Sequence, residues 1–142
     1  MPLVNDILLR SHVWLLGILI VPMIKWLPLS YVLRLLTPPK WLKPYRRISR
    51  ERILDLVDRR LAQPKVMVHR PCLRRGLVLF HVLQLSGLPA KLNFAIYSPL
   101  CPKTMLRGHC WVMVDDWCAG DPPASSLTII WTHPKAKMYR DS

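Results

Sequence analysis

The chain has 142 residues, of which 51% are hydrophobic, and its 21 Lys and Arg against 8 Asp and Glu give a formal net charge of +13. This length allows one core of ordinary size and excludes a second independent domain. The apolar content excludes wholesale disorder. Such a charge favours an anionic membrane surface, an acidic peptide or nucleic acid, or is merely a solvated basic face. We expect no nucleic-acid partner, because no zinc-finger spacing or RNP-like strand is present.

Four cysteines, Cys72, Cys101, Cys110 and Cys118, bear on the compartment and on metal binding. No secretory signal with a small-residue cleavage site precedes them, so we expect reduced thiols and a cytoplasmic protein, with membrane association as the alternative. A zinc site of Cys101, His109, Cys110 and Cys118 is disfavoured, because no CxxC or HxxxH knuckle is present. We therefore expect no bound metal and no cofactor.

The most apolar part of the chain is residues 7–36. Its longest uninterrupted apolar run, Val13–Ile24, is shorter than the roughly twenty residues that a membrane-spanning helix needs. We predict two short helices packed as a hairpin, with Pro22 or Pro28 near the corner. Peripheral contact with a membrane is the alternative. A proline-rich basic linker follows at 37–47.

Two further helices are predicted in the middle of the chain. Residues 49–63 carry apolar side chains at helical spacing behind Ser49, a suitable N-cap. The next helix begins at Cys72, directly after Pro71, and stops at Gly87, which is suited to the C′ position.

Beyond Gly87 the apolar period changes to alternation, which predicts strands. We expect them at 92–97, 109–114, 117–121 and 127–131, with a turn at Asp115–Asp116. Helices followed by an antiparallel sheet, packed against the helix that begins at Cys72, make an α+β fold.

Cys72 is the candidate nucleophile. A helix N-terminus lowers the pKa of a thiol, because the free N–H groups and the macrodipole favour the thiolate. Arg70, Arg74 and Arg75 add positive charge nearby. The alternative is a small buried core residue.

His109, at the start of a strand, is the candidate base, and Asp121 at the end of the next strand would hold its tautomer. If Asp115–Asp116 is a plain two-residue turn, Asp121 shares a face with Cys110 and not with His109. We therefore predict an odd loop or a bulge in this hairpin. Asp115 and Asp116 are rivals for the third position, although turn carboxylates are more commonly solvated.

Four segments together resemble a known family. Cys-Leu-x-Arg opens a helix at Cys72, Gly-Leu-Pro-Ala spans 87–90, Gly-His-x-Trp-Val-x-Val-Asp spans 108–115, and Asp121 follows. In combination they look like the transglutaminase-like cysteine protease of lasso peptide biosynthesis, the leader peptidase or maturation B-protein. The resemblance covers about 50–125 well. The N-terminal third is similar only in its leucine-rich character.

Two departures from the family pattern are visible. The turn reads Val-Asp-Asp where the family commonly has Val-Asp-Gly, and Cys110 stands where a small residue is usual. Neither change touches Cys72, His109 or Asp121. The first leaves the turn geometry open.

The resemblance implies a peptidase that cuts a ribosomally made precursor between leader and core, with Cys72, His109 and Asp121 as its triad. Its partners would be the precursor leader, a separate winged-helix recognition protein and an asparagine-synthetase-like cyclase, with any ATP requirement belonging to the maturation complex. The chain resembles the stand-alone protease subunit, since it is too short to carry the recognition domain as well. Residues 1–47 are then expected to dock partners, and 48–142 to form the protease domain.

The mechanism that this triad predicts is acyl transfer from peptide to Cys72 and then to water, with the backbone N–H of Cys72 as one oxyanion donor. Two other functions stay open. One is a transglutaminase-like acyltransferase or amidase that uses the same triad on another substrate. The other is a basic, membrane-peripheral binding protein in which Cys72 only fills the core.

Overall fold

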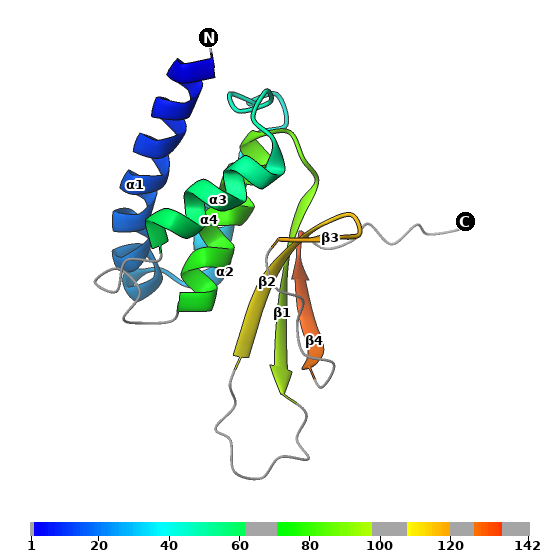
Figure 1. Ribbon diagram of the computed structural model, residues 1–142. Helices are drawn as coiled ribbons and strands as arrows, with labels where there is room; N and C mark the ends of the chain where they lie inside the picture. Colours follow the sequence, from blue (N-terminus) through cyan, green and yellow to red (C-terminus); the bar gives the residue numbers. More distant parts are fainter. Residues whose placement is uncertain (1, 62–70, 98–107, 120–126, 135–142) are drawn as a thin grey trace.

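Helices come first along the chain and the sheet follows, so the predicted α+β class is confirmed. Figure 1 shows the computed structural model, which describes residues 2–61, 71–97, 108–119 and 127–134. Within these ranges the elements are α1 (Pro2–Trp26), α2 (Leu29–Leu36), α3 (Arg50–Leu61), α4 (Pro71–Leu85), β1 (Ala90–Tyr97), β2 (Gly108–Val114), β3 (Trp117–Cys118) and β4 (Leu127–His133).

The first helix is longer than its sequence predicted. α1 is 25 residues long and runs through Pro22, and the chain turns into α2 at Pro28, whose backbone is extended. The prediction of two short helices is therefore wrong for the first of them, and Pro28 forms the corner. In the described part of the chain, α1 alone is long and apolar enough to cross a membrane by length and composition, a test that core helices and signal sequences also pass.

The predicted caps of α3 and α4 are confirmed. The backbone N–H of Arg52 donates to Ser49 Oγ over 3.3 Å, which caps the start of α3. At the end of α4 the N–H of Leu88 donates to the carbonyl of Leu83 over 3.2 Å, and Gly87 N–H donates to Gln84. Gly87 has a φ of 86°, as this Schellman motif requires.

The described strands form an antiparallel sheet in the order β3-β2-β1-β4. β1 lies in the middle and pairs with β2 from Ala90↔Val114 to Ile96↔Gly108. Its pairing with β4 shifts register between Phe94 and Ala95. The helices lie together on one side of this sheet (Figure 1), and α4 is the helix that contacts both β1 and β2.

One hydrophobic cluster joins the helices to the sheet. It runs from Leu9 on α1 through Val32, Ile53 and Phe80 to Val112 on β2, each with at most 1% of its surface exposed. The N-terminal helices therefore share one core with the segment at 48–142.

A small polar cluster lies half-buried between α1, α4 and the end of α2. His12 Nδ1 lies 2.8 Å from the hydroxyl of Tyr45, and His81 Nδ1 donates to the carbonyl of Leu36 over 2.7 Å. The two imidazole rings meet edge to face, 5.2 Å apart. Burial lowers the pKa of both histidines, and the proximity of His81 lowers that of His12 further.

These lowered pKa values predict a loss of stability in mild acid. Between the folded-state pKa values and about 6.5, the unfolded chain binds more protons than the folded chain, so stability falls as the pH drops through this window. Urea denaturation should give a smaller free energy of unfolding at about pH 5.5 than at about pH 7.5. The difference in unfolding free energy between the two pH values should be smaller in His12→Gln than in the wild type. An equal difference in the two proteins would contradict the assignment of this pH dependence to the histidine pair.

Candidate active site

The start of α4 supplies the candidate nucleophile. Pro71 occupies the first helical position and Cys72 the second, as predicted. Cys72 is described by its backbone alone. Its N–H is one of the first four of the helix, which have no acceptor within the helix and can bind an anion.

His109 is the second residue of β2. It pairs with Ala95 of β1 and is half-buried, and its ring stacks on that of Trp111 with centroids 5.8 Å apart. Because side chains alternate along a strand, His109 and Trp111 share one face of the sheet. Cys110 and Val112 occupy the opposite face, which packs on α4.

The contact between α4 and β2 is close enough to exclude a side chain at Gly76. A Cβ there would lie 2.8 Å from Cys110 Sγ and 2.9 Å from Leu92 Cδ1. Helix position 76 therefore lies against strand position 110 with only hydrogen between them. The contact between these two positions sets the position of α4 along the strands of the sheet.

This contact puts the starts of α4 and β2 at the same end of the molecule, while the side chain of His109 lies on the face of the sheet away from α4. α4 ends where β1 begins, and β2 is antiparallel to β1, so α4 and β2 run in the same direction (Figure 1). Cys72 precedes Gly76 by four residues, about 6 Å along the helix axis, and His109 precedes Cys110 by one residue, about 3.3 Å. The start of the helix and the start of the strand thus meet at one end of the molecule.

The hairpin between β2 and β3 has a plain two-residue turn. Asp115 adopts a φ of 52°, which aspartate tolerates better than most residues, so no glycine is needed. The prediction of an odd loop or a bulge is therefore wrong in the part of the hairpin that is described. The register is Met113↔Cys118 and Val114↔Trp117, continued by the N–H of Ala119, which donates to the carbonyl of Val112 over 2.9 Å.

Asp121 lies outside the described residues, and its role as third member stays a prediction. The regular register up to Ala119 weakens it, because this register, if continued, would put Asp121 on the face of Cys110, so the role requires an irregularity after Ala119. The rivals Asp115 and Asp116 are exposed in the turn. They lie at the opposite end of β2 from His109, roughly 20 Å away at the rise of a strand. Neither can hydrogen-bond to His109.

Arg75 makes a connection that the sequence did not reveal. Its guanidinium donates from Nε and Nη2 to the two carboxylate oxygens of Asp58 on α3, over 2.6 and 3.2 Å. Nη1 donates to the carbonyl of Ala119 over 3.2 Å. The carboxylate of Asp58 therefore offsets the positive charge that Arg75 was predicted to add near Cys72. In the sequence, the only sign of a special role for Arg75 was its place in the Cys-Leu-x-Arg motif.

The zinc alternative gains no support from the described residues. No group of three His, Cys, Asp or Glu side chains gathers there, and Cys101 lies outside them. Cys110 Sγ is directed at α4, on the opposite face of the sheet from His109.

A pocket of about 530 Å³ opens at the far end of α4 from Cys72. The length of α4 separates the two by roughly 20 Å. The pocket has apolar walls and cationic lysines, and no acidic residue lines it. Its lining is Thr37, Pro38, Pro39, Lys40, Lys43, Gln84, Gly87, Leu88, Pro89, Ala90, Lys91 and Pro134.

Comparison with known families gives one match. The model of the transglutaminase-like superfamily matches residues 9–132, from within α1 to within β4. No curated protein and no solved structure matches the chain. The match takes in the N-terminal helices as well as the sheet.

The α4–β2 contact predicts that Gly76→Ala destabilises the fold. The added methyl must displace Cys110 or Leu92 or push α4 away, which should cost about 1–3 kcal/mol in urea denaturation. Gly17→Ala is the matched control, because a Cβ on that helical glycine meets only Leu61 at 3.8 Å. Adding Cys110→Ala to Gly76→Ala should restore part of the loss. Equal effects at positions 76 and 17 would contradict this account.

Proposed function

The chain belongs to the transglutaminase-like superfamily, and on that premise we propose that it is a cysteine peptidase that removes the leader from a lasso precursor peptide. The superfamily includes cysteine proteases and acyltransferases. The observation that supports the proposal is that α4, which begins at Pro71 and Cys72, and β2, whose second residue is His109, start at the same end of the molecule. The motifs around these two residues favour the lasso leader peptidases within the superfamily.

The proposed reaction has two acyl-transfer steps. The Cys72 thiolate attacks the last carbonyl of the leader, and the backbone N–H of Cys72 binds the oxyanion. The C–N bond breaks as the His109 imidazolium gives its proton to the departing amine of the core peptide. Neutral His109 then removes a proton from water, which hydrolyses the thioester and regenerates Cys72. Asp121 would accept a hydrogen bond from the other ring nitrogen and fix the tautomer.

Arg75 fits this scheme as a positioning residue. It leaves α4 one turn after Cys72 and holds the carbonyl of Ala119, two residues before Asp121. Asp58 fixes the guanidinium from the other side. This arrangement would hold the segment that leads to Asp121 at a fixed distance from α4, the helix that bears Cys72.

The lysine-lined pocket is the proposed docking site for the leader. Lys40, Lys43 and Lys91 would attract acidic side chains, and the prolines offer an apolar floor. An extended peptide rises about 3.3 Å per residue, so six or seven residues reach from this pocket to Cys72. The region at 1–47 would also bind the separate recognition protein. The cyclase would then act on the freed core peptide in the cytoplasm.

Replacing Cys72 tests the chemistry. With its precursor and recognition protein, the Cys72→Ala variant should lose cleavage by at least about 1000-fold by mass spectrometry, because nucleophile and base act as a unit. His109→Ala should fall similarly, whereas Cys118→Ala should cleave normally. Undiminished cleavage by Cys72→Ala would refute the proposal. Transfer of the leader to an added amine in preference to water would instead identify an acyltransferase.

Neutralising the pocket tests the docking site. Lys40→Gln/Lys43→Gln should raise KM for the precursor by about tenfold and leave kcat nearly unchanged, since the contact is equally strong in the ground state and the transition state. Added salt should narrow the gap between wild type and variant. Lys25→Gln/Arg34→Gln removes the same charge elsewhere and should leave KM unchanged. An equal rise in KM in both variants would show that only net charge matters.

A further inference from the structure

The outward side of α1 is an exposed apolar face. Large side chains with 46–62% of their surface exposed cover about half of the circumference of the helix. From residue 14 to residue 21 the exposed positions carry no charged side chain, and the indole N–H of Trp14 is their one polar group. Apolar surfaces of this extent mark interaction sites. The face is formed by Ile7, Leu8, Trp14, Leu15, Ile18 and Leu19.

The opposite side of α1 is the side that packs into the hydrophobic core. Leu9, Val13, Leu16 and Ile20 are 0–7% exposed and belong to the core. An ordinary surface helix is apolar on one side and polar on the other. The residues of the second apolar side are not part of the core, and Trp14 at its edge makes a cation–π contact with Arg60, 5.4 Å from the ring.

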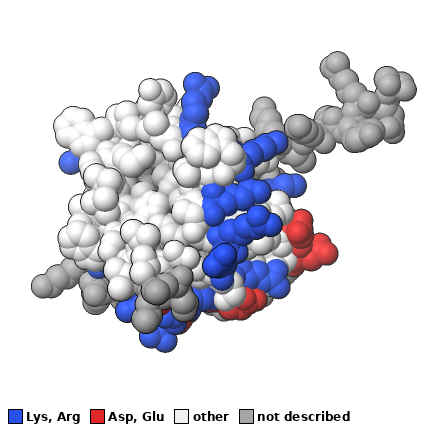
Figure 2. Space-filling view, turned by 90° about the horizontal axis from the view of Figure 1, so that it is seen from above, with Lys and Arg blue, Asp and Glu red and all other residues white. Residues whose placement is uncertain are grey.

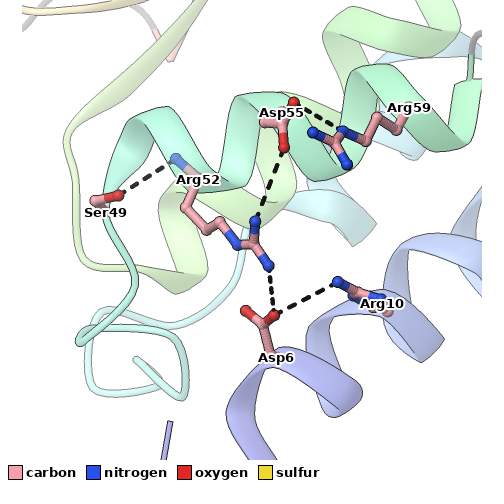
Figure 3. Close-up of polar contacts among 6 residues, drawn as sticks. All are labelled: Asp6, Arg10, Ser49, Arg52, Asp55 and Arg59. Atoms are coloured by element: carbon pink, nitrogen blue, oxygen red, sulfur yellow. Dashed lines mark hydrogen bonds and ion pairs between the residues drawn. The ribbon is translucent and has the colours of Figure 1, made fainter. Parts of the chain in front are cut away.

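The charges around this face are cationic. Asp6 is the only acid on α1, and it is held toward α3 by Arg52 at 2.7 Å, with Arg10 at 3.8 Å (Figure 3). The hydrogen bond from Arg52 keeps the pKa of Asp6 below its usual value. Arg10 and Lys25 are exposed near the two ends of the helix.

The wider surface has the same character. Seen from above, the side of the molecule nearest α1 (left in Figure 2) is a broad, almost uncharged area, and Lys and Arg gather in a band beside it. The chain as a whole carries +13. An apolar face surrounded by basic residues is complementary to a lipid membrane surface, where anionic headgroups lie above the hydrocarbon of the acyl chains.

We propose that the outer face of α1 lies on an anionic membrane surface, with the helix axis in the plane of the bilayer. Lipid fits this face better than a protein does, because protein interfaces carry about one hydrogen bond per 100–200 Å². The stretch from Trp14 to Val21 offers a single side-chain donor, the indole N–H of Trp14, and no side-chain acceptor. An in-plane position leaves Leu9 and Ile20 in the core, whereas insertion across the bilayer would tear them out of it. The proposal is independent of the peptidase activity, because the surface is separate from Cys72 and His109.

Sedimentation of the full chain with lipid vesicles tests the proposal. Binding to phosphatidylcholine vesicles with about 30% phosphatidylglycerol should be at least tenfold tighter than to phosphatidylcholine alone, and salt should weaken it. Leu15→Glu/Ile18→Glu should reduce binding at least tenfold. Ile130→Glu is the matched control, because Ile130 is 60% exposed on β4, away from α1, and this variant should bind like wild type.

A second variant separates charge from apolar contact and does not depend on the folding of the first. Arg10→Gln/Lys25→Gln should weaken binding to the anionic vesicles several-fold and leave binding to neutral vesicles unchanged. A wild-type chain that stays in the supernatant with both kinds of vesicle would overturn the proposal. So would a soluble dimer that Leu15→Glu/Ile18→Glu converts to a monomer, since the face would then bind a second copy. Equal loss of binding in Ile130→Glu would also overturn it.

Discussion

The arrangement depends on one contact, the approach of α4 to β2 at Gly76. A glycine without a side chain lets the helix backbone come within reach of Cys110 and Leu92, and this fixes the position of the helix along the strands. The Schellman turn at Gly87 sets the direction, because it sends the chain from the end of α4 straight into β1. Together these two glycines bring the starts of α4 and β2 to the same end of the molecule.

Sequence reasoning succeeded where the signal was local. Pro71 marks a helix start and Gly87 a helix stop, and alternation marks the strands, so the class and the sites of Cys72 and His109 were predictable. It failed for α1, because a helix that is apolar on both sides has no 3.6-residue period and resembles a broken apolar run. The hairpin was mispredicted because its irregularity was inferred from the requirement that Asp121 face His109, whereas Asp115 adopts a positive φ and closes a plain two-residue turn. Nothing local pairs Arg75 with Asp58.

Charge is distributed unevenly over the fold. Near the start of α4, Arg75 binds Asp58 and the carbonyl of Ala119, whereas Lys40 and Lys43 lie at a pocket without an acidic lining. The exposed apolar face of α1 carries no acidic side chain, because Asp6, the only acid on this helix, is paired with Arg52 on α3. In the two proposals above, the positive charge of the chain acts at two surfaces remote from the nucleophile, and neither proposal requires a strongly basic active site.

The contact at Gly76 also has a consequence for how the sequence can vary. Cys110 stands where a small residue is usual in the lasso leader peptidases, and its Sγ is one of the two atoms that a side chain at position 76 would meet. The sizes of the two side chains are thus tied: a smaller residue at 110 frees space for a methyl group at 76, and a larger one demands glycine there. Homologous chains should show these two positions covarying in volume, a signature that can be sought in sequences without any structure.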